Sequence, residues 1–232
     1  MTPAHPRGPY AKGRERRREI LRAALDAYSE AGVRGVPLKE IANRAGVTEA
    51  GLLHHFGSKE ALLSEVLHAR DAATAEALGD LLDRNHVRDL ARHNTTTPGL
   101  VRLFVDVVAA ASSPDHPAHD GWRERYRRIC ALNETGFERE VAAATRHDGP
   151  PAEGPAPDGP ALDGPALDGT CADGRLDDAA WMSRILVAAM DGLQLQWLLD
   201  DGVDMAADIA RLHSALVAVG ARARRTRPPA EN

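Results

Sequence analysis

Apolar residues recur every three or four positions along most of this 232-residue chain, the spacing that places them on one face of an α-helix. The first such set is Ile20, Leu21, Ala24, Leu25 and Tyr28. Nowhere do apolar and polar residues alternate in a short run bounded by turn residues, which is the pattern of a half-buried strand. The sequence therefore predicts an all-α fold.

Capping residues divide the periodic segments into successive helices. Pro37 suits the first position of a helix, Gly46 suits a helix end, and Thr48 suits the cap of the next helix. On these signals we expect helices at about 14–31, 38–45, 49–56, from 58 onward, 98–111, 118–144, 177–200 and 205–219.

Residues 148–174 do not fit a core. They repeat Asp-Gly-Pro-Ala-Leu at Asp158–Leu162 and again at Asp163–Leu167, with Gly-Pro pairs on either side. Gly and Pro at this density break helices, and the acidic residues favour contact with water. We interpret the segment as a flexible linker between two helices; an acidic interaction tail or lid is the alternative.

Charge is distributed unevenly along the chain. Residues 1–60 carry eleven basic and seven acidic side chains, whereas the remainder carries 18 basic and 27 acidic ones. A basic N-terminal region on an acidic body favours a polyanionic partner for that region. Because no apolar run approaches the roughly 18 residues of a membrane-spanning helix and no secretory signal is seen, we expect a cytoplasmic protein with no membrane partner.

Residues 38–56 have the layout of a helix-turn-helix. Small Ala42 lets two helices approach and Gly46 turns the chain, while Ile41, Val47 and Leu52 supply a miniature core. In such a unit the second helix enters the major groove of DNA. The spacing alone also occurs in helical bundles that do not bind DNA.

The residue types in this segment are a more specific signal than their spacing. It combines Ile41-Ala42, Ala45-Gly46-Val47-Thr48, Leu52, His55-Phe56 and Ser58-Lys59-Glu60-Ala61-Leu62-Leu63, preceded by Tyr28 and Gly32. In order and spacing these residues resemble the DNA-binding domain of TetR/AcrR-family transcriptional regulators. The resemblance implies a disordered arm at 1–13, a DNA-binding domain at 14–62, a helical regulatory and dimerisation domain at 63–224 and a disordered tail at 225–232.

The resemblance also implies roles for individual residues. Thr48 would cap the recognition helix and contact a phosphate. His55 and Lys59 would also contact phosphates, Lys59 from the start of the fourth helix. Because they are positively charged, Lys39 and Arg44 are expected to make two further contacts with the DNA backbone. The full set of expected DNA-binding residues is Lys39, Arg44, Thr48, Glu49, Ala50, Gly51, His54, His55 and Lys59.

The chain departs from the family pattern at three places. Val36 and Pro37 replace a frequent threonine cap, and Leu53 replaces a tyrosine that offers a hydroxyl to phosphate. Glu49 stands where lysine is frequent; its carboxylate repels phosphate but accepts a hydrogen bond from a cytosine amino group. These departures weaken single contacts and leave the fold expectation unchanged.

The last two expected helices are suited to dimerisation. Residues 177–200 are apolar nearly all round, and residues 205–219 carry a short heptad-like seam. Pairing the two helices with those of a second subunit would bury both in a four-helix bundle. The expected dimerisation residues are Ile185, Leu193, Trp197, Ile209, Leu212 and Leu216.

Aromatic, aliphatic and thioether side chains of the middle helices predict a pocket for a mostly apolar effector. The expected lining is Phe104, Val108, Trp122, Tyr126, Met182, Met190 and Gln194, with Arg123 as a further polar group. Core packing is the alternative for each of these residues taken singly.

Other chemistry-bearing residues have ordinary explanations. His116 and His119 have a spacing that suits a metal, although a solvated loop explains them equally well. Cys130 fits a helix core and Cys171 lies in the linker, with a redox switch as the alternative. We expect no cofactor, no metal and no catalytic residues. The sequence thus predicts a homodimeric, ligand-responsive repressor that binds a palindromic operator; the alternatives are a small all-α enzyme or metal-binding bundle, and a helical scaffold that has lost DNA binding.

Overall fold

The computed structural model describes residues 9–31, 35–78, 86–147 and 178–226, and in these ranges the regular structure is entirely helical. The helices are α1 (Pro9–Glu30), α2 (Leu38–Ala45), α3 (Glu49–Phe56), α4 (Lys59–Leu78), α5 (His86–Thr95), α6 (Pro98–Ala111), α7 (His119–His147), α8 (Ala179–Leu199) and α9 (Met205–Thr226). The all-α prediction is confirmed.

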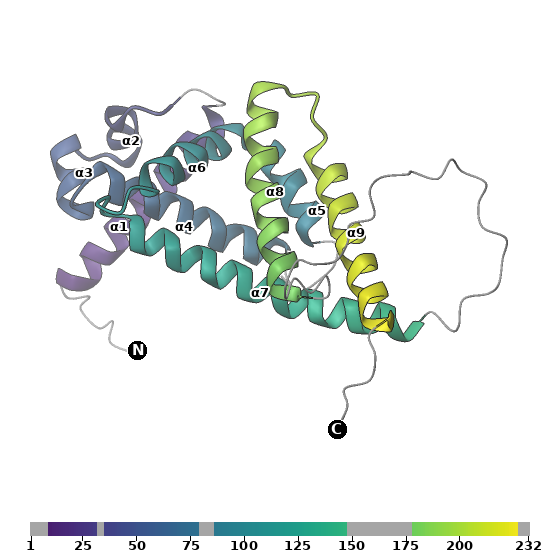
Figure 1. Ribbon diagram of the computed structural model, residues 1–232. Helices are drawn as coiled ribbons and strands as arrows, with labels where there is room; N and C mark the ends of the chain where they lie inside the picture. The colour runs from purple at the N-terminus through teal and green to yellow at the C-terminus, as the bar shows by residue number, and fades with distance from the viewer. Residues whose placement is uncertain (1–8, 32–34, 79–85, 148–177, 227–232) are drawn as a thin grey trace, which may run out of the picture.

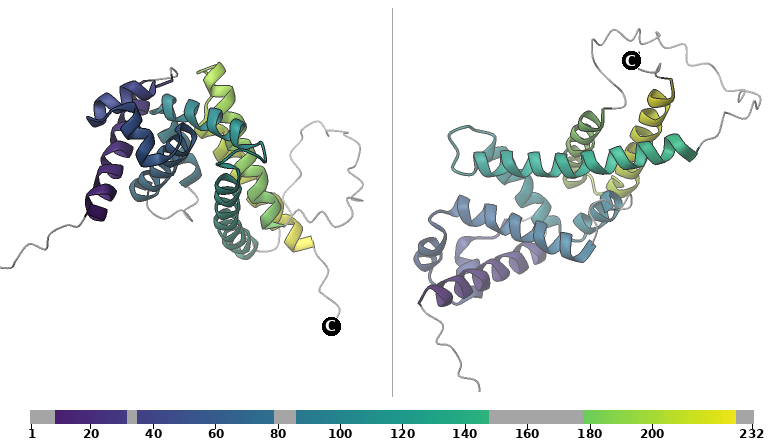
Figure 2. Two further views of the ribbon diagram at one scale, coloured as in Figure 1. Left: turned by 90° about the vertical axis from the view of Figure 1, so that its left-hand side faces the viewer. Right: turned by 90° about the horizontal axis from the view of Figure 1, so that it is seen from below.

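The helices form two regions that share α4 (Figure 1). We call α1–α3 and the first turn of α4 the head, which lies at one end of the molecule. The rest of α4 and α5–α9 form the body, in which α8 and α9 stand side by side at the other end. Seen from below, α7 extends as one long helix across the body (Figure 2).

One core joins the head to the body. It contains buried side chains of α1, α3 and α4 such as Ile20, Leu52 and Leu62, and it continues without a break to Phe104 of α6 and Trp122 of α7. The domain boundary expected at residue 62 therefore falls inside a continuous helix, α4, and beside a continuous core. The head and the body are therefore packed against each other through one shared core.

A second core lies between α5, α7, α8 and α9. Phe137, Met182 and Ile209 are among its fully buried side chains. The close approach of α9 depends on Gly220, because a Cβ there would lie 2.4 Å from the Met182 side chain and 3.0 Å from that of Val141.

Helix bounds differ from the expected ones in a few places. Helix α1 begins at Pro9 rather than Arg14, since proline fits the first turn of a helix. Helix α5 was not anticipated, because its sequence is polar with few apolar residues. Helix α9 continues to Thr226, so residues 225 and 226 are not tail. The predicted linker, 148–174, lies outside the described residues, as do Gly32 and Cys171.

Candidate DNA-binding surface and effector cavity

The turn between α2 and α3 has the geometry that its residues predict. Gly46 adopts φ 64°, the left-handed conformation that glycine tolerates best, and its N–H reaches the carbonyls of Ala42 and Asn43. Thr48 then caps α3, because its side-chain oxygen accepts a hydrogen bond of 3.0 Å from the N–H of Gly51. The cap expected at Thr48 is confirmed.

Two arginines of α1 hold this unit in place, and sequence reasoning missed both. Arg16 donates a 2.8 Å hydrogen bond to the carbonyl of Gly46, in the turn. Arg17 donates to the carbonyl of His55 and pairs with Glu65, and its guanidinium lies 4.2 Å from the centre of the Phe56 ring. The α1 helix is thus tied to the turn and to the end of α3.

The outer face of α3 is exposed to solvent. Thr48, Glu49, Ala50 and His54 are exposed, and Gly51 and His55 are half-buried. The inner face instead carries Leu52 and Phe56, which are buried in the core shared by the head and the body. An exposed helix face of this kind, next to a basic region, is free to meet the edges of base pairs.

Lysines flank this face. Lys39 is exposed on α2, and Lys59 is exposed at the first residue of α4, where Ser58 accepts a 3.1 Å hydrogen bond from the N–H of Ala61. Unpaired N–H groups of a helix N-terminus add to the attraction for phosphate. Arg44 differs, because it pairs with Glu30 at 2.7 Å and Glu40 at 2.8 Å. These two ion pairs compete with a phosphate for the guanidinium, and the DNA contact of Arg44 stays a prediction.

Comparisons with known proteins agree with this geometry. Residues 20–66 match the family model described as bacterial regulatory proteins, tetR family. The chain is 38% identical over 125 residues to the HTH-type transcriptional repressor KstR2 of Rhodococcus jostii (strain RHA1), a match that spans 51% of this chain and only 58% of that repressor. Residues 20–66 therefore contain a DNA-binding domain of the TetR family.

Solved structures show the same fold over nearly the whole chain. Thermus thermophilus FadR, a TetR-family repressor in complex with lauroyl-CoA, has 17% identity and a TM-score of 0.54, over 93% of this chain and 98% of that one. NalD, the secondary repressor of the MexAB-OprM multidrug efflux pump in Pseudomonas aeruginosa, has 21% identity and a TM-score of 0.51, over 90% and 96%.

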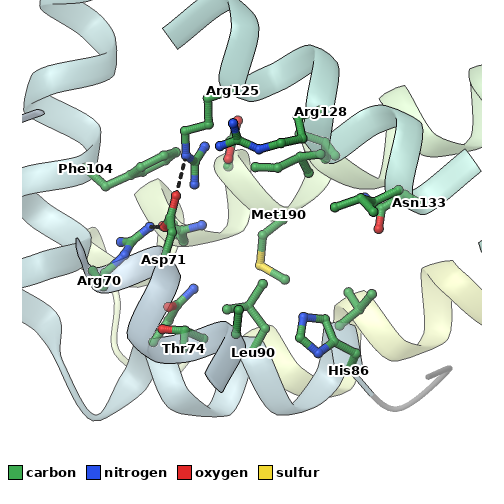
Figure 3. Close-up of a pocket in the computed structure, with 18 of the residues that line it drawn as sticks. Arg70, Asp71, Thr74, His86, Leu90, Phe104, Arg125, Arg128, Asn133 and Met190 are labelled. Atoms are coloured by element: carbon green, nitrogen blue, oxygen red, sulfur yellow. Dashed lines mark hydrogen bonds and ion pairs between the residues drawn. The ribbon is translucent and has the colours of Figure 1, made fainter. Parts of the chain in front are cut away.

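The body contains a cavity of about 380 Å³, within the range of small-molecule sites. Its walls come from α4, α5, α6, α7 and α8, and most of them are apolar, including Leu90, Leu186 and Met190. Figure 3 shows Arg70, Asp71 and Arg125 together at one end, with Leu90 and Met190 between them and His86.

The charged end of the cavity contains two buried arginines that share one carboxylate. Arg125 donates from Nε to Asp71 at 2.6 Å, and Arg70 donates from Nη2 to the same carboxylate at 3.0 Å. Burial alone would raise the pKa of Asp71, but the hydrogen bond from Arg125 and the charge of Arg70 outweigh it and lower that pKa. Burial lowers the pKa of Arg70.

The expected pocket residues divide into two groups. Phe104, Met190 and Gln194 line the cavity, as predicted. The other four do not line this cavity: Val108, Trp122, Tyr126 and Met182. The effector role of all seven residues stays a prediction.

Each misplaced residue has another role. Trp122 is buried in the first core against Phe104, and Val108 packs at its margin. Met182 fills the second core. The Tyr126 hydroxyl donates to Asp191 at 2.7 Å, behind the cavity wall. Arg123 does not line the cavity and lies near Asp120 instead. Arg125 supplies the polar group in the cavity that was expected of Arg123.

Exposed apolar side chains mark one face of the α8–α9 pair. Ile185, Leu195, Leu199 and Val219 are exposed, with Leu199 the most open at 83%. Of the expected dimerisation residues, Ile185 belongs to this face, whereas Leu193, Trp197 and Leu212 are half-buried on the second core.

Two of the expected dimerisation residues face inward instead. Ile209 is fully buried and Leu216 is 7% exposed, both inside the subunit's own core. These two positions of the α9 seam therefore pack within the subunit, whereas Val219 at its end is exposed. The dimerisation role of the seam stays a prediction.

The remaining candidates have local contacts. His116 Nδ1 accepts from the N–H of Ala118 at 3.2 Å, and His119 Nδ1 lies 2.9 Å from the carbonyl of Ala111. Cys130 is half-buried as a free thiol, and its carbonyl accepts from the Ser183 hydroxyl. Over the described residues there is no grouping of three or more potential metal ligands, and no helix there is long and apolar enough to cross a membrane.

Proposed function

We propose that this protein is a homodimeric transcriptional repressor of the cytoplasm, which binds a palindromic operator and leaves it when a small molecule fills the body cavity. The observation that carries the proposal is the helix-turn-helix. Its recognition helix, α3, is capped by Thr48, tied down by Arg16 and Arg17, and exposed on its outer face.

Helix α4 supports a link between the cavity and DNA. Its first residue, Lys59, lies beside the recognition helix, and Arg70, Asp71 and Thr74 of the same helix line the cavity. A ligand that moves α4 would therefore move Lys59 and α3 with it. To release DNA, it must bind the DNA-incompatible state more tightly than the DNA-bound state. Moving a 1:99 equilibrium to 99:1 needs a difference of about 5.5 kcal/mol.

Two further observations support the effector and the dimer. The cavity has apolar walls with a few polar groups, and the structural neighbour FadR is in complex with lauroyl-CoA. The exposed apolar side chains of α8 and α9, among which Leu195 and Leu199 are the most open, are suited to contact with a second copy of the chain. Two heads about 34–36 Å apart would then read half-sites one helical turn apart.

Operator binding is the test. The dimer should shift DNA taken from its own upstream region, or DNA selected from a random pool, in a gel assay. Lys59→Ala should weaken binding to every sequence and reduce the salt slope of log K by about 0.9, the value for one phosphate. Arg127→Ala, which removes an exposed arginine of α7 paired with Glu124, is the matched control and should change neither quantity. A wild-type protein that selects no DNA would refute the proposal.

A further inference from the structure

The polar atoms of the cavity are not all satisfied. Arg70 is 8% exposed and its Nη1 has no hydrogen-bond partner among the described residues, although its Nη2 binds Asp71. Gln194 is 4% exposed, and its Oε1 also lacks a partner within those residues. Buried polar groups are rarely left in this state, because desolvation without a hydrogen bond costs free energy.

The two buried arginines at this end of the cavity have one carboxylate in direct contact. Arg70 and Arg125 are both more than nine-tenths buried, and they share the single carboxylate of Asp71. Nearby aromatic rings stabilise part of this positive charge. Arg125 lies 4.8 Å from the centre of the Trp122 ring, and Arg70 lies 5.4 Å from the centre of the Phe104 ring. Arg128 adds a further cation to the lining, from an exposed position.

Asp191 compensates only in part for the positive charge of the second arginine. It lines the cavity but accepts the hydroxyl hydrogen bond of Tyr126 at 2.7 Å. Burial raises the pKa of Asp191 above its ordinary value, against the lowering effects of Tyr126 and Arg125. Asp71 is already occupied by both arginines. A cationic ligand would therefore meet two carboxylates that already accept hydrogen bonds and two guanidinium groups that repel it.

Gln194 does not determine the sign of the ligand's charge. Its amide can present either the oxygen or the NH₂ group after a rotation, so it suits a donor or an acceptor. Arg70 does determine it, since a guanidinium only donates and binds carboxylates in preference to neutral oxygens. The rest of the lining, with Leu90, Leu186 and Met190, is suited to an alkyl or ring body.

From this geometry we infer that the effector is an apolar molecule carrying a carboxylate, which binds Nη1 of Arg70 while its apolar body lies against α5 and α8. This inference rests on the proposed function for the cavity being an effector site, and it specifies the chemistry of that effector. It assigns Arg70 as the residue that distinguishes an acid from a neutral molecule of the same shape.

Three probes of one chain length test the inference: decanoate, decan-1-ol and decylamine, each titrated calorimetrically into the full-length protein at neutral pH. Decanoate should bind about tenfold or more tightly than decan-1-ol, as expected for a charge-assisted hydrogen bond, and decylamine should bind weakest. In Arg70→Met the acid and the alcohol should bind with the same affinity. In Arg123→Met, which removes an exposed arginine of α7 outside the cavity, the preference for decanoate should persist.

The outcomes separate this inference from the proposed function. Equal binding of decanoate and decan-1-ol to the wild-type protein, or no binding of decanoate at millimolar concentration, would overturn the inference and leave operator binding unaffected. A retained preference for decanoate in Arg70→Met would overturn the assignment to Arg70. The wild-type comparison requires no variant, so a misfolded Arg70→Met would not remove the test.

Discussion

The head and the body use arginine in different ways. In the head, Arg16 and Arg17 are about one-third exposed, and they donate to backbone carbonyls at the turn and at the end of α3. In the body, Arg70 and Arg125 are buried and share one carboxylate, with one nitrogen left without a partner among the described residues. Satisfied guanidinium groups fix the shape of a binding surface, whereas an incompletely satisfied buried one prepares a site for a ligand.

The largest effect should come from the surface that joins two bodies. Leu195→Glu places a charge among the exposed apolar side chains of α8, where Leu195 is 48% exposed. We expect monomers by sedimentation and a loss of operator affinity of about 10² or more, because one head alone forfeits the gain of bivalent binding. Ala131→Glu, at an exposed position on α7, is the control. A Leu195→Glu protein that stays dimeric at micromolar concentration would exclude this face as the interface.

The next effect tests the buried arginines. Arg125→Met removes the shortest bond to Asp71 and leaves that half-buried carboxylate with Arg70 alone. Breaking a buried pair costs about 3–5 kcal/mol, and the remaining partner should reduce the loss to about 2–3 kcal/mol of unfolding free energy. Chemical denaturation measures this loss. An unchanged denaturation midpoint would mean that the shared carboxylate contributes nothing to folding.

A smaller effect should follow from the corresponding change in the head. Arg17→Met removes the bonds to the His55 carbonyl and Glu65 and the contact with the Phe56 ring, all at a partly exposed site. We expect a loss of about 1–2 kcal/mol, equal to a few degrees in Tm for a chain of this size. Arg18→Met is the matched control, because Arg18 is 65% exposed and pairs only one turn away, with Glu15. If the two variants have the same Tm, the contacts of Arg17 between α1 and the end of α3 do not stabilise the fold.

The same contrast explains what the sequence could predict. The bounds of α2 and the caps of the turn follow from local signals, so Gly46 and Thr48 lie as expected. Tyr126 and Arg125 are adjacent on α7, yet only Arg125 lines the cavity. The difference is one of helix rotation, which is set by packing against distant segments and leaves no trace in local spacing.

Burial of charged and apolar side chains was equally hard to foresee. Arg17, Arg70 and Arg125 look like other arginines in a chain whose basic residues are mostly arginine. Leu216 looks like an interface residue, because a regular seam fits a core within the chain as well as a partner. Long-range contacts decide both cases, and a single sequence does not contain them.

The smallest effect separates the two roles expected of Thr48, capping α3 and contacting DNA. Thr48→Ala removes the oxygen that accepts from the Gly51 N–H at 3.0 Å, at a cost of about 1 kcal/mol. Thr48→Asp keeps an acceptor at the cap and places a negative charge where the helix N-terminus favours one, so its stability should return to that of wild type. Operator affinity should follow the opposite order, since an aspartate at this exposed position repels phosphate while an alanine only lacks a hydrogen bond. We therefore expect Thr48→Asp to melt higher than Thr48→Ala but to bind DNA more weakly. If affinity instead rose and fell with the melting temperature across the two variants, Thr48 would act on DNA only through the stability of α3.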